Sequence, residues 1–549
     1  MYPRFFPLSE TSITVEWGKC IDDTLHQQVL ALDYSLHQVP FEGLLETVPA
    51  FVSLTIYFQP EAIVPQNLTP FLWVKNYIET LLQQATRGFP VAKNVVSIPV
   101  CYDPEFGHDL DFVAATHGIS KEKVIEIHQQ TAYKVYMMGF LPGFAYLGTL
   151  EEAIATPRKP MPRPKVEAGS VGIAGNQTGI YPLQSPGGWQ IIGRTPNSMF
   201  DSAKANPFLL KTGDTVKFLA ITKEAFYLAE SSKAEISEPQ KTDDFADAVV
   251  IKPGVYTTIQ DQGRFGFRAY GLPQSGAMDI VAHHMANALV GNTQQAATLE
   301  CTMGGMVLQF KKDTRIALTG AGAAFINDIS IQLYQPYIVS KNEVLTIRFN
   351  QKGVRTYLAV QGGFASENIM NSKSTCPMVG IGMPLTKGQG LRFDKDFSTE
   401  PKKIAGDLPL PAFVARKIIR VFQGPEFTWM TAESAQRLYS QQFTLSNHCD
   451  RMGYHLLGEP LLKSNTLELI STAVTIGTIQ LTPNGQLIVL MSDCQTTGGY
   501  PRVGQIAAVD LPIVAQLIPG EMITFEPISF TEAETLYLIQ QKAIDALFR

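Results

Sequence analysis

Residues 168–196 read AGSVGIAGNQTGIYPLQSPGGWQIIGRTP, and no other part of the chain restricts the fold as strongly. The stretch holds seven glycines and three prolines. In a helix interior glycine costs about 1 kcal/mol and proline about 3 kcal/mol relative to alanine. A helix is therefore excluded, and short strands joined by glycine turns remain. Strand-like runs dominate the neighbouring residues 95–229 as well, with one pair of helices at residues 108–130. We predict a β-rich domain here.

Composition limits the class of protein. A chain of 549 residues, 45% of them hydrophobic, has room for roughly three to five domains. Its net charge of -6 argues against a general nucleic-acid or membrane partner, since both need a basic surface. The six cysteines form no C-x-x-C pair, so neither a zinc site nor a disulfide framework is indicated. With no export signal or long apolar run in view, we expect a cytoplasmic protein.

The first 92 residues mix helices and strands, and we predict an α+β domain. A helix is expected over residues 22–38, behind an aspartate cap, and a second one is expected to begin near Pro70. The run VPAFVSLTIYF, residues 48–58, is typical of one buried strand. Leucine and valine spacing places one apolar face on the first helix, made of Leu25, Val29, Leu32 and Leu36.

Two polar segments divide the rest of the chain. Residues 231–247, SSKAEISEPQKTDDFAD, bury too little apolar area to fold and are predicted to be a linker. A weaker break lies at residues 395–411. We therefore predict domains at 1–92, 93–230, 248–400 and 411–549, with the C-terminal half mainly β and built of barrels.

One helix stands out in the C-terminal half. Residues 275–292 read SGAMDIVAHHMANALVGN, and we expect Ser275 to cap the helix and Gly291 to end it. Its predicted apolar face consists of Met278, Val281, Met285 and Leu289.

The two halves also share a short sequence repeat. MGF at Met138 is followed by QTGIYP at Gln177, and MGY at Met452 is followed by QTTGGYP at Gln495. Two copies of one barrel unit would explain this pattern, and chance similarity of turn-rich segments is the alternative.

Basic residues gather beside the glycine-rich stretch. TPRKPMPRPK places Arg158, Lys159, Arg163 and Lys165 within eight residues of a proline-rich, extended segment. Such a patch suits carboxylate or phosphate, and a solvated surface loop is the alternative. Polar groups and glycine N–H groups of the stretch itself add donors, from Gln177, Thr178, Tyr181 and Arg194.

Several enzyme classes lack their signatures. No G-x-x-x-x-G-K-[ST], G-x-S-x-G or H-E-x-x-H is present. No Met-Lys-Met segment that would carry biotin is present either. The run TRIALTGAGAAFIND, residues 314–328, is predicted to be a strand followed by a β-turn instead of a dinucleotide site, and DISIQLYQPYIV downstream is typical of a strand.

Longer motifs carry a family resemblance. VYMMGFLPGFAYLG and the stretch from TPRKPMPRPK to IIGRTP are similar to the Kip-inhibitor (allophanate hydrolase subunit 1) family, now understood as the B subunit of 5-oxoprolinase. GVYTTIQDQGRFGFRAYGLPQSGAMDIVAHHMANALVGN, RMGYHLLGEPL and SDCQTTGGYPRVGQIAAVDL resemble the C subunit of 5-oxoprolinase. The resemblance implies tandem cyclophilin-like β-barrels and a B–C fusion joined at residues 231–247.

The resemblance also implies a function. It implies that the chain is a component of an ATP-dependent lactam hydrolase, 5-oxoprolinase. With a separate A subunit in trans, this enzyme phosphorylates the lactam oxygen of 5-oxo-L-proline before hydrolysis to L-glutamate. ATP with Mg²⁺ is the expected cofactor, and covalent biotin is not expected. Metal ligands are not assigned. The acidic candidates for metal or proton handling are Asp261, Asp279 and Glu300. The candidates for substrate and phosphate binding are Arg158, Arg163, Ser170, Gln177, Tyr181, Arg194, Arg264, Gln274, Ser275, Gln495 and Tyr500.

Two other functions stay open. The same pair of families forms the carboxyltransferase part of urea carboxylase, which would require biotin machinery in trans, and the B-like half resembles regulators of a histidine kinase. His108 and Cys494 depart from the family pattern, which leaves the role of the loop after Cys494 open. We expect structural roles for His128 and for the pair His283 and His284. Formation of a homo-oligomer is left open.

Overall fold

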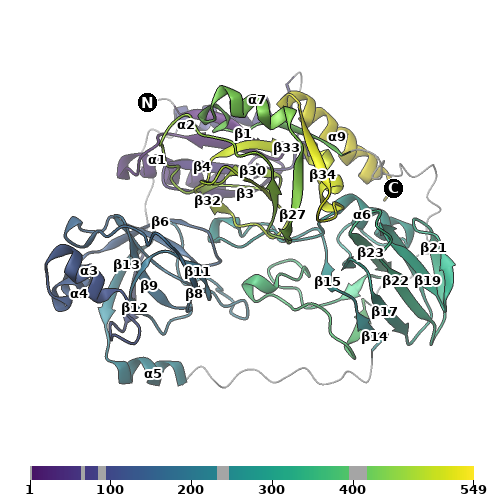
Figure 1. The fold of residues 1–549 in the computed structure, drawn as a ribbon, viewed down its shortest axis with the longest axis horizontal. Helices are drawn as coiled ribbons and strands as arrows, with labels where there is room; N and C mark the ends of the chain where they lie inside the picture. The colour runs from purple at the N-terminus through teal and green to yellow at the C-terminus, as the bar shows by residue number, and fades with distance from the viewer. Residues whose placement is uncertain (1–2, 64–67, 85–93, 232–245, 395–416, 549) are drawn as a thin grey trace.

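The computed structural model describes residues 3–63, 68–84, 94–231, 246–394 and 417–548. The fold is mostly β with barrel-like sheets, as predicted. Figure 1 shows two tiers: the N-terminal domain lies beside the C-terminal barrel in the upper tier, and the two middle domains lie below them. The Phe71 N–H donates to Glu534 Oε1 at 2.8 Å across the upper tier. The two ends of the chain therefore pack together.

The N-terminal domain is a four-stranded sheet covered by two helices. Helix α1 begins after Asp22, whose carboxylate accepts the Leu25 N–H at 2.8 Å, and α2 begins at Pro70, as predicted. The single strand predicted over residues 48–58 is wrong, because the chain turns at residues 50–52. These turn residues are apolar because Phe51 is buried against Tyr136 of the next domain. The elements, with sheet order β1-β2-β4-β3, are α1 (Asp23–Gln38), α2 (Pro70–Gln84), β1 (Arg4–Ser9), β2 (Ser12–Glu16), β3 (Leu44–Pro49) and β4 (Ser53–Phe58).

The glycine-rich stretch forms strands of the first barrel. Seven strands run in the order β12-β9-β10-β7-β6-β13-β5, and a bridge between Cys101 and Arg194 joins the two ends. The predicted helix pair is present as α3 (Leu110–His117) and α4 (Lys121–Gln130). The strands are β5 (Val95–Val100), β6 (Tyr133–Met138), β7 (Ala145–Gly148), β9 (Ser170–Ala174), β10 (Gln177–Ile180), β12 (Gln190–Arg194) and β13 (Thr215–Ala220), with a separate hairpin of β8 (Arg163–Val166) and β11 (Ser185–Gly187) and the helix α5 (Lys223–Ser231).

The C-terminal domain repeats this barrel strand by strand. Its closed order is β26-β33-β30-β31-β28-β27-β34, and in both barrels the first strand pairs in parallel with the last. The strands are β26 (Ile418–Gln423), β27 (Phe443–Cys449), β28 (Gly453–Leu457), β30 (Thr478–Leu481), β31 (Leu487–Leu490), β33 (Arg502–Ile506) and β34 (Met522–Pro527). The pair β29 (Thr472–Ala473) and β32 (Thr497–Gly498) and the helices α7 (Ala432–Ser440), α8 (Leu511–Ala515) and α9 (Phe530–Ala546) complete it.

The repeat is real, but the predicted register of its motifs is wrong. QTGIYP lies on β10, whereas QTTGGYP lies between β31 and β33. The matching topology instead aligns QSPGGWQIIG, residues 184–193, with QTTGGYPRVG, residues 495–504. Likewise GFAYLG, residues 143–148, aligns with GYHLLG, residues 453–458. Repeated Gly and Gln in turn-rich segments allowed the shifted match.

Two sheets share one core where the resemblance implies a barrel over residues 248–400. Their orders are β20-β19-β22-β17-β14-β25-β24 and β15-β16-β23-β18-β21. The strands are β14 (Ala248–Pro253), β15 (Tyr256–Gln260), β16 (Thr298–Thr302), β17 (Met306–Phe310), β18 (Thr314–Gly320), β19 (Ala323–Ile326), β20 (Ile329–Ile331), β21 (Pro336–Val339), β22 (Val344–Arg348), β23 (Arg355–Val360), β24 (Phe364–Ala365) and β25 (Gly390–Phe393). Residues 314–328 form β18 and a turn, as predicted, and the short strand β19, which was not predicted.

The predicted helix is present as α6 (Ile280–Leu289), but its cap is Asp279. The Asp279 carboxylate accepts the Ala282 N–H at 2.9 Å. Ser275 lies outside the helix with a φ of 58°, and its N–H donates to the Ser492 carbonyl of the C-terminal barrel at 3.0 Å. This tertiary contact moves the helix start away from Ser275.

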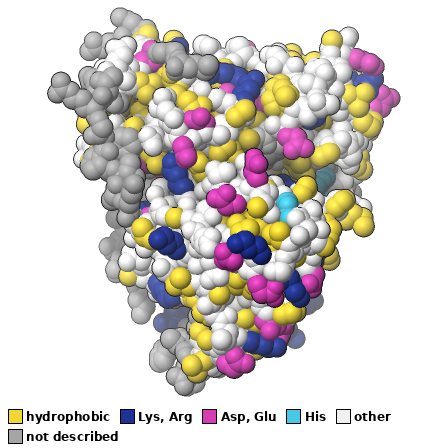
Figure 2. All heavy atoms as spheres, turned by 90° about the vertical axis from the view of Figure 1, so that its left-hand side faces the viewer, with side chains coloured by type: hydrophobic (Ala, Val, Ile, Leu, Met, Phe, Trp, Pro, Cys, Tyr) yellow, Lys and Arg dark blue, Asp and Glu magenta, His cyan; other side chains and the backbone are white. Residues whose placement is uncertain are grey.

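Most of the predicted linker 231–247 and the predicted break at residues 395–411 lie outside the described residues. Among the described helices, none is both long and apolar enough to cross a membrane. Figure 2 shows the face made by the N-terminal domain and the first barrel, where basic and acidic side chains are interspersed.

Candidate functional site

The predicted site residues fall into two separate regions. The first lies in the first barrel, where a hollow of ≈ 160 Å³ collects part of the predicted anion set. Arg163, Ser170 and Arg194 all line it, together with Lys165 and the family departure His108. All its lining residues belong to the first half, so Gln274 and Ser275 of the second half do not contribute.

A buried carboxylate holds the basic segment of this hollow in place. Both terminal nitrogens of Arg163 donate hydrogen bonds to the Asp109 carboxylate, at 2.7 and 2.8 Å, and Lys159 Nζ lies 2.8 Å from the same carboxylate. Asp109 also accepts the Ile191 N–H of β12 at 2.7 Å. Burial alone would raise the pKa of Asp109, but its bonds to Arg163 and Lys159 bring it below its ordinary value. Asp109 therefore stays ionised and fastens the segment to the barrel.

The second barrel contains the same contact. Glu426 accepts the Arg502 N–H of β33 at 3.1 Å and the Arg502 side chain at 2.8 and 2.9 Å. Arg502 and Ile191 occupy matching positions, two residues before Gly504 and Gly193. Asp109 and Glu426 are thus equivalent carboxylates, and the Arg163 contact has a structural counterpart in the other barrel.

Other predicted residues of the first half lie apart from the hollow. Gln177 begins β10 and Tyr181 follows its end, so about 13 Å of strand separates them. Tyr181 is buried in an aromatic cluster, with its ring 5.3 Å from Phe144. Arg158 is exposed and lies 6.0 Å from the Trp189 ring centroid.

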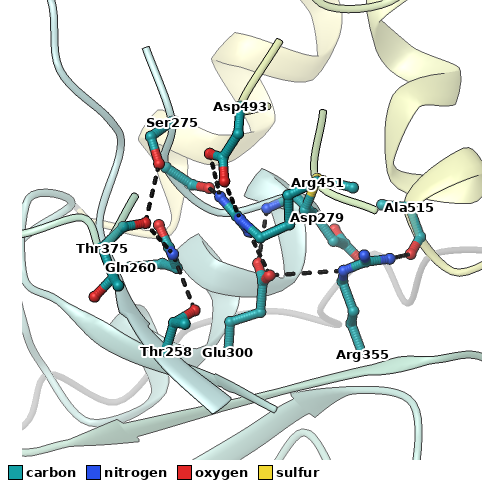
Figure 3. Close-up of polar contacts among 12 residues, drawn as sticks. Thr258, Gln260, Ser275, Asp279, Glu300, Arg355, Thr375, Arg451, Asp493 and Ala515 are labelled. Atoms are coloured by element: carbon teal, nitrogen blue, oxygen red, sulfur yellow. Dashed lines mark hydrogen bonds and ion pairs between the residues drawn. The ribbon is translucent and has the colours of Figure 1, made fainter. Parts of the chain in front are cut away.

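The second region is a buried charge network between the two domains of the C-terminal half (Figure 3). Arg451 lies between Glu300 of β16 and Asp493, with bonds of 2.5 Å to Glu300 and 2.8 and 3.0 Å to Asp493. Arg355 of β23 lies 3.6 Å from Glu300 and donates to Tyr454 across the interface at 2.7 Å. The network therefore locks the C-terminal barrel to the domain before it.

Glu300 is the anionic centre of this network. It accepts the Met278 N–H at 2.8 Å and the Tyr357 hydroxyl at 2.7 Å in addition to Arg451. Burial acts to raise the pKa of Glu300, but Arg451 and Arg355 outweigh it, and the pKa lies below its ordinary value. Glu300 is therefore a permanent anion in a structural position.

Asp279 differs from Glu300 because no cation among the described residues forms an ion pair with it. Its carboxylate accepts only N–H groups, from Ala282 and from the Gln516 side chain, both at 2.9 Å. Complete burial raises the pKa of Asp279 to about 6. The raised pKa brings the protonation equilibrium of Asp279 close to neutral pH.

The remaining predicted residues of this half have defined places. Asp261 accepts four hydrogen bonds, from Ser372, Ser374 and the N–H groups of Gly263 and Lys373, and so is a saturated turn acceptor. Gln274 accepts from Arg268, and the Ser275 hydroxyl donates to the Thr375 carbonyl at 3.3 Å. Arg264 is buried beside them. Gln495 is half-buried and Tyr500 is 43% exposed, both in the loop after β31.

The three histidines expected to be structural, and Cys494, are all buried. His128 is buried between Tyr102 and Thr178, and burial lowers its pKa to about 3. Burial also lowers the pKa of His283 to about 4 and that of His284 well below its ordinary value. Burial raises the pKa of the Cys494 thiol to about 12, which makes it a poor nucleophile at neutral pH.

Sequence reasoning missed the residues that organise both regions. Asp109, Arg355, Arg451 and Asp493 carry the ionic contacts that hold them together. The only sequence signal was their type, because a charged residue between apolar strand residues is usually paired. Their partners lie far away in the chain, so the pairing itself could not be predicted.

Comparison with known proteins gives the class. Residues 3–210 match the model of the carboxyltransferase domain, subdomain C and D, and residues 270–527 match that of the carboxyltransferase domain, subdomain A and B. The crystal structure of TTHA0988 superposes with a TM-score of 0.81 at 32% identity, over 94% of this chain and 99% of that one. The chain therefore belongs to the carboxyltransferase-domain family.

Different relatives match the N-terminal and C-terminal halves of the chain. It is 42% identical to the B subunit of 5-oxoprolinase from Bacillus subtilis (strain 168), over 40% of this chain and 93% of the relative. It is 37% identical to the C subunit of 5-oxoprolinase from Escherichia coli (strain K12), over 54% of this chain and 96% of the relative. The urea amidolyase of Lachancea kluyveri is 29% identical, and the match spans 18% of that protein. Within its family, the chain is a fusion of a B-like and a C-like half.

Proposed function

We propose that this chain is the B–C component of an ATP-dependent 5-oxoprolinase and that, with a separate A subunit, it converts 5-oxo-L-proline to L-glutamate. One observation carries the proposal: a single chain covers 93% of the B subunit of one 5-oxoprolinase and 96% of the C subunit of another. The urea amidolyases match over only a small part of their own length. The reaction consumes ATP and water and releases L-glutamate, ADP and phosphate.

The chemistry needs a group that moves a proton and a site for an anionic substrate. Water must add to the lactam carbon while the ring nitrogen gains a proton. Asp279 suits the proton role, because its raised pKa leaves both protonation states accessible near neutrality. Arg163, Arg194 and Ser170 line the hollow of the first barrel and offer donors to a small anion, although Asp109 and Glu230 already pair with the two arginines and Glu105 and Glu167 line the hollow as well.

ATP and Mg²⁺ are expected cofactors of the assembled enzyme. In the described part of the chain, no three His, Cys, Asp or Glu side chains gather in a way that could hold a metal ion. Asp261 and Glu300 already have filled acceptor positions. These residues do not fit a magnesium–nucleotide site, and no step through the nucleotide is assigned to this chain.

Reconstitution tests the proposal. The purified chain is mixed with the A subunit of a 5-oxoprolinase, 5-oxo-L-proline, ATP and Mg²⁺, and glutamate and ADP are measured together. We expect equal amounts of both products from the mixture and none from either protein alone. Absence of 5-oxoproline-dependent turnover, with activity on urea in the presence of a biotin carboxylase and a biotin carrier, would establish carboxyl transfer instead.

A further inference from the structure

Arg264 is a buried cation without a carboxylate partner in the described part of the chain. Arg264 follows β15 and is 1% exposed. Nε donates to the Ile369 carbonyl at 3.0 Å and one terminal nitrogen, Nη2, donates to the Ser374 carbonyl at 2.8 Å. The other terminal nitrogen, Nη1, is buried and has no hydrogen-bond partner. Both N–H donors of Nη1 are therefore unused.

The other buried arginines of the described residues are neutralised. Each of them pairs with a buried carboxylate: Arg268 with Glu46, Arg355 and Arg451 with Glu300, and Arg502 with Glu426. A buried charge without a partner costs several kcal/mol, so native proteins pair it or let a ligand neutralise it. The nearest acids do not do this for Arg264, because Asp493 pairs with Arg451 and Asp261 serves the turn around it.

Arg264 lies beside the contact between the two halves. An apolar cluster joins Phe200 of the first half to Leu272 and Cys376 of the second. Nearby, the rings of Phe208 and Tyr270 stack at 4.4 Å, and the Gly143 N–H donates to the Tyr270 carbonyl at 2.9 Å. Ligand sites occur preferentially where domains meet, because side chains from both sides can converge there.

The backbone around Arg264 is strained on both sides. Ser275, Met370 and Asn371 have φ values of 58°, 51° and 64°, which only glycine adopts readily. Gly263 and Gly276 approach so closely that a Cβ on Gly276 would lie 2.8 Å from the Gly263 nitrogen. Residues held in such conformations cluster at ligand sites, where the surrounding structure enforces them.

The guanidinium lies next to a surface segment. The Ile369 carbonyl that accepts from Nε belongs to a half-buried residue, and residues 366–368 just before it are exposed. A carboxylate oxygen can accept an N–H of Nη1 and supply the missing negative charge.

We propose that Arg264 Nη1 binds the carboxylate of the small amide substrate, at the contact between the two halves. This inference rests on the proposed function and adds to it the group that recognises the substrate's acid. The hollow around Arg163 is then not the site of that carboxylate.

Ligand binding to the full chain, without ATP and without any partner protein, tests the assignment. Calorimetry compares 5-oxo-L-proline with pyrrolidin-2-one, the same lactam without the carboxylate, and with acetate. We expect the wild type to bind 5-oxo-L-proline at least tenfold more tightly than either probe. Arg264→Met should weaken 5-oxo-L-proline at least tenfold and leave pyrrolidin-2-one unchanged, while the exposed-arginine control Arg348→Met should change neither.

Three outcomes would overturn the assignment. They are wild-type binding that does not distinguish the two lactams, acetate binding as tight as that of 5-oxo-L-proline, and loss of affinity in Arg163→Met but not in Arg264→Met. Arg264→Met leaves no carboxylate unpaired but removes the hydrogen bonds to the Ile369 and Ser374 carbonyls, so thermal unfolding of the variant is measured beside binding. If it does not fold, Arg264→Lys keeps the charge and should bind with at most a partial loss. Binding without reconstituted turnover would refute the proposed function and leave this site standing.

Discussion

Replacing Asp279 by asparagine should change the stability of the protein more favourably at neutral pH than at acidic pH. Asparagine carries no charge, so it keeps the cap on Ala282 and removes the cost of a buried anion, but its amide N–H opposes the Gln516 Nε2 donor, which costs about 1–3 kcal/mol at any pH. The pKa of Asp279 rises from 3.8 to about 6 on folding. At about 1.4 kcal/mol per pH unit this corresponds to a penalty of about 3 kcal/mol, which the variant would not have.

The sign of the pH dependence follows from proton binding. Between pH 3.8 and about 6 the folded state binds more protons at Asp279 than the unfolded state, so its contribution to stability falls as pH rises through this window. The stability of the variant relative to the wild type should therefore be about 2 kcal/mol higher at pH 7.5 than at pH 4.5, because the cost at Gln516 is the same at both pH values. Urea denaturation at the two pH values, followed by tryptophan fluorescence, measures this difference.

Asp261→Asn is the matched control. Asp261 accepts four hydrogen bonds, so an amide there places an N–H against another donor and should cost about 1–3 kcal/mol. If Asp279→Asn shifts the stability equally at both pH values, then the carboxyl group has an ordinary pKa and the reasoning is wrong. If Asp279 moves a proton in the reaction, the variant should also lose turnover by roughly a hundredfold or more.

Two further substitutions test the ionic contacts by urea denaturation. Arg451→Met leaves the buried Asp493 without its cation and Glu300 with Arg355 alone, and should cost about 3–5 kcal/mol, whereas Arg348→Met at an exposed pair should cost less than about 1 kcal/mol. Arg163→Ala should cost about 1–3 kcal/mol, because Asp109 is buried, whereas Lys165→Ala should stay within about 0.5 kcal/mol. The Asp109 contribution is present above its ordinary pKa and should be lost as pH falls, so equal costs of Arg163→Ala at pH 7 and pH 3 would contradict the ion pair.

Local patterns predicted most of the regular elements. The helix at residues 23–38 follows from an aspartate cap and an apolar face at helical spacing, and both are properties of adjacent residues. The glycine and proline content excluded a helix from residues 168–196, which form strands of the barrel. In these segments the local preference and the tertiary structure agree.

Tertiary contacts explain where prediction failed. The turn at Phe51 contains apolar residues because another domain covers it, so the sequence looks like one continuous strand. Ser275 looked like a helix cap, but a contact with the C-terminal barrel holds it in a left-handed conformation. Neither neighbour is close in sequence, so no local pattern could indicate it.

The residue types of the candidate site could be predicted from the sequence, whereas the ion pairs between them could not. Arg163 and Arg194 were expected to contact anions, and both line one hollow. The basic cluster alone did not indicate that Asp109 occupies both terminal nitrogens of Arg163. Among the three acids, the difference between Asp279 and Glu300 depends on whether a distant arginine is in contact, which is a property of the folded chain.

Comparison of the two barrels separates structure from function in the first one. In the second barrel the cation that binds Glu426 is Arg502, a fully buried residue of strand β33 itself. In the first barrel Ile191 takes that place in the strand, and the cation comes from Arg163 on the separate hairpin. Because Arg163 reaches Asp109 from outside, its side chain stays 28% exposed and borders a hollow. The carboxylate–cation contact is present in both barrels and therefore belongs to the barrel structure. In the first barrel the cation comes from a separate hairpin, and this leaves Arg163 partly accessible beside the hollow, which the barrel itself does not require.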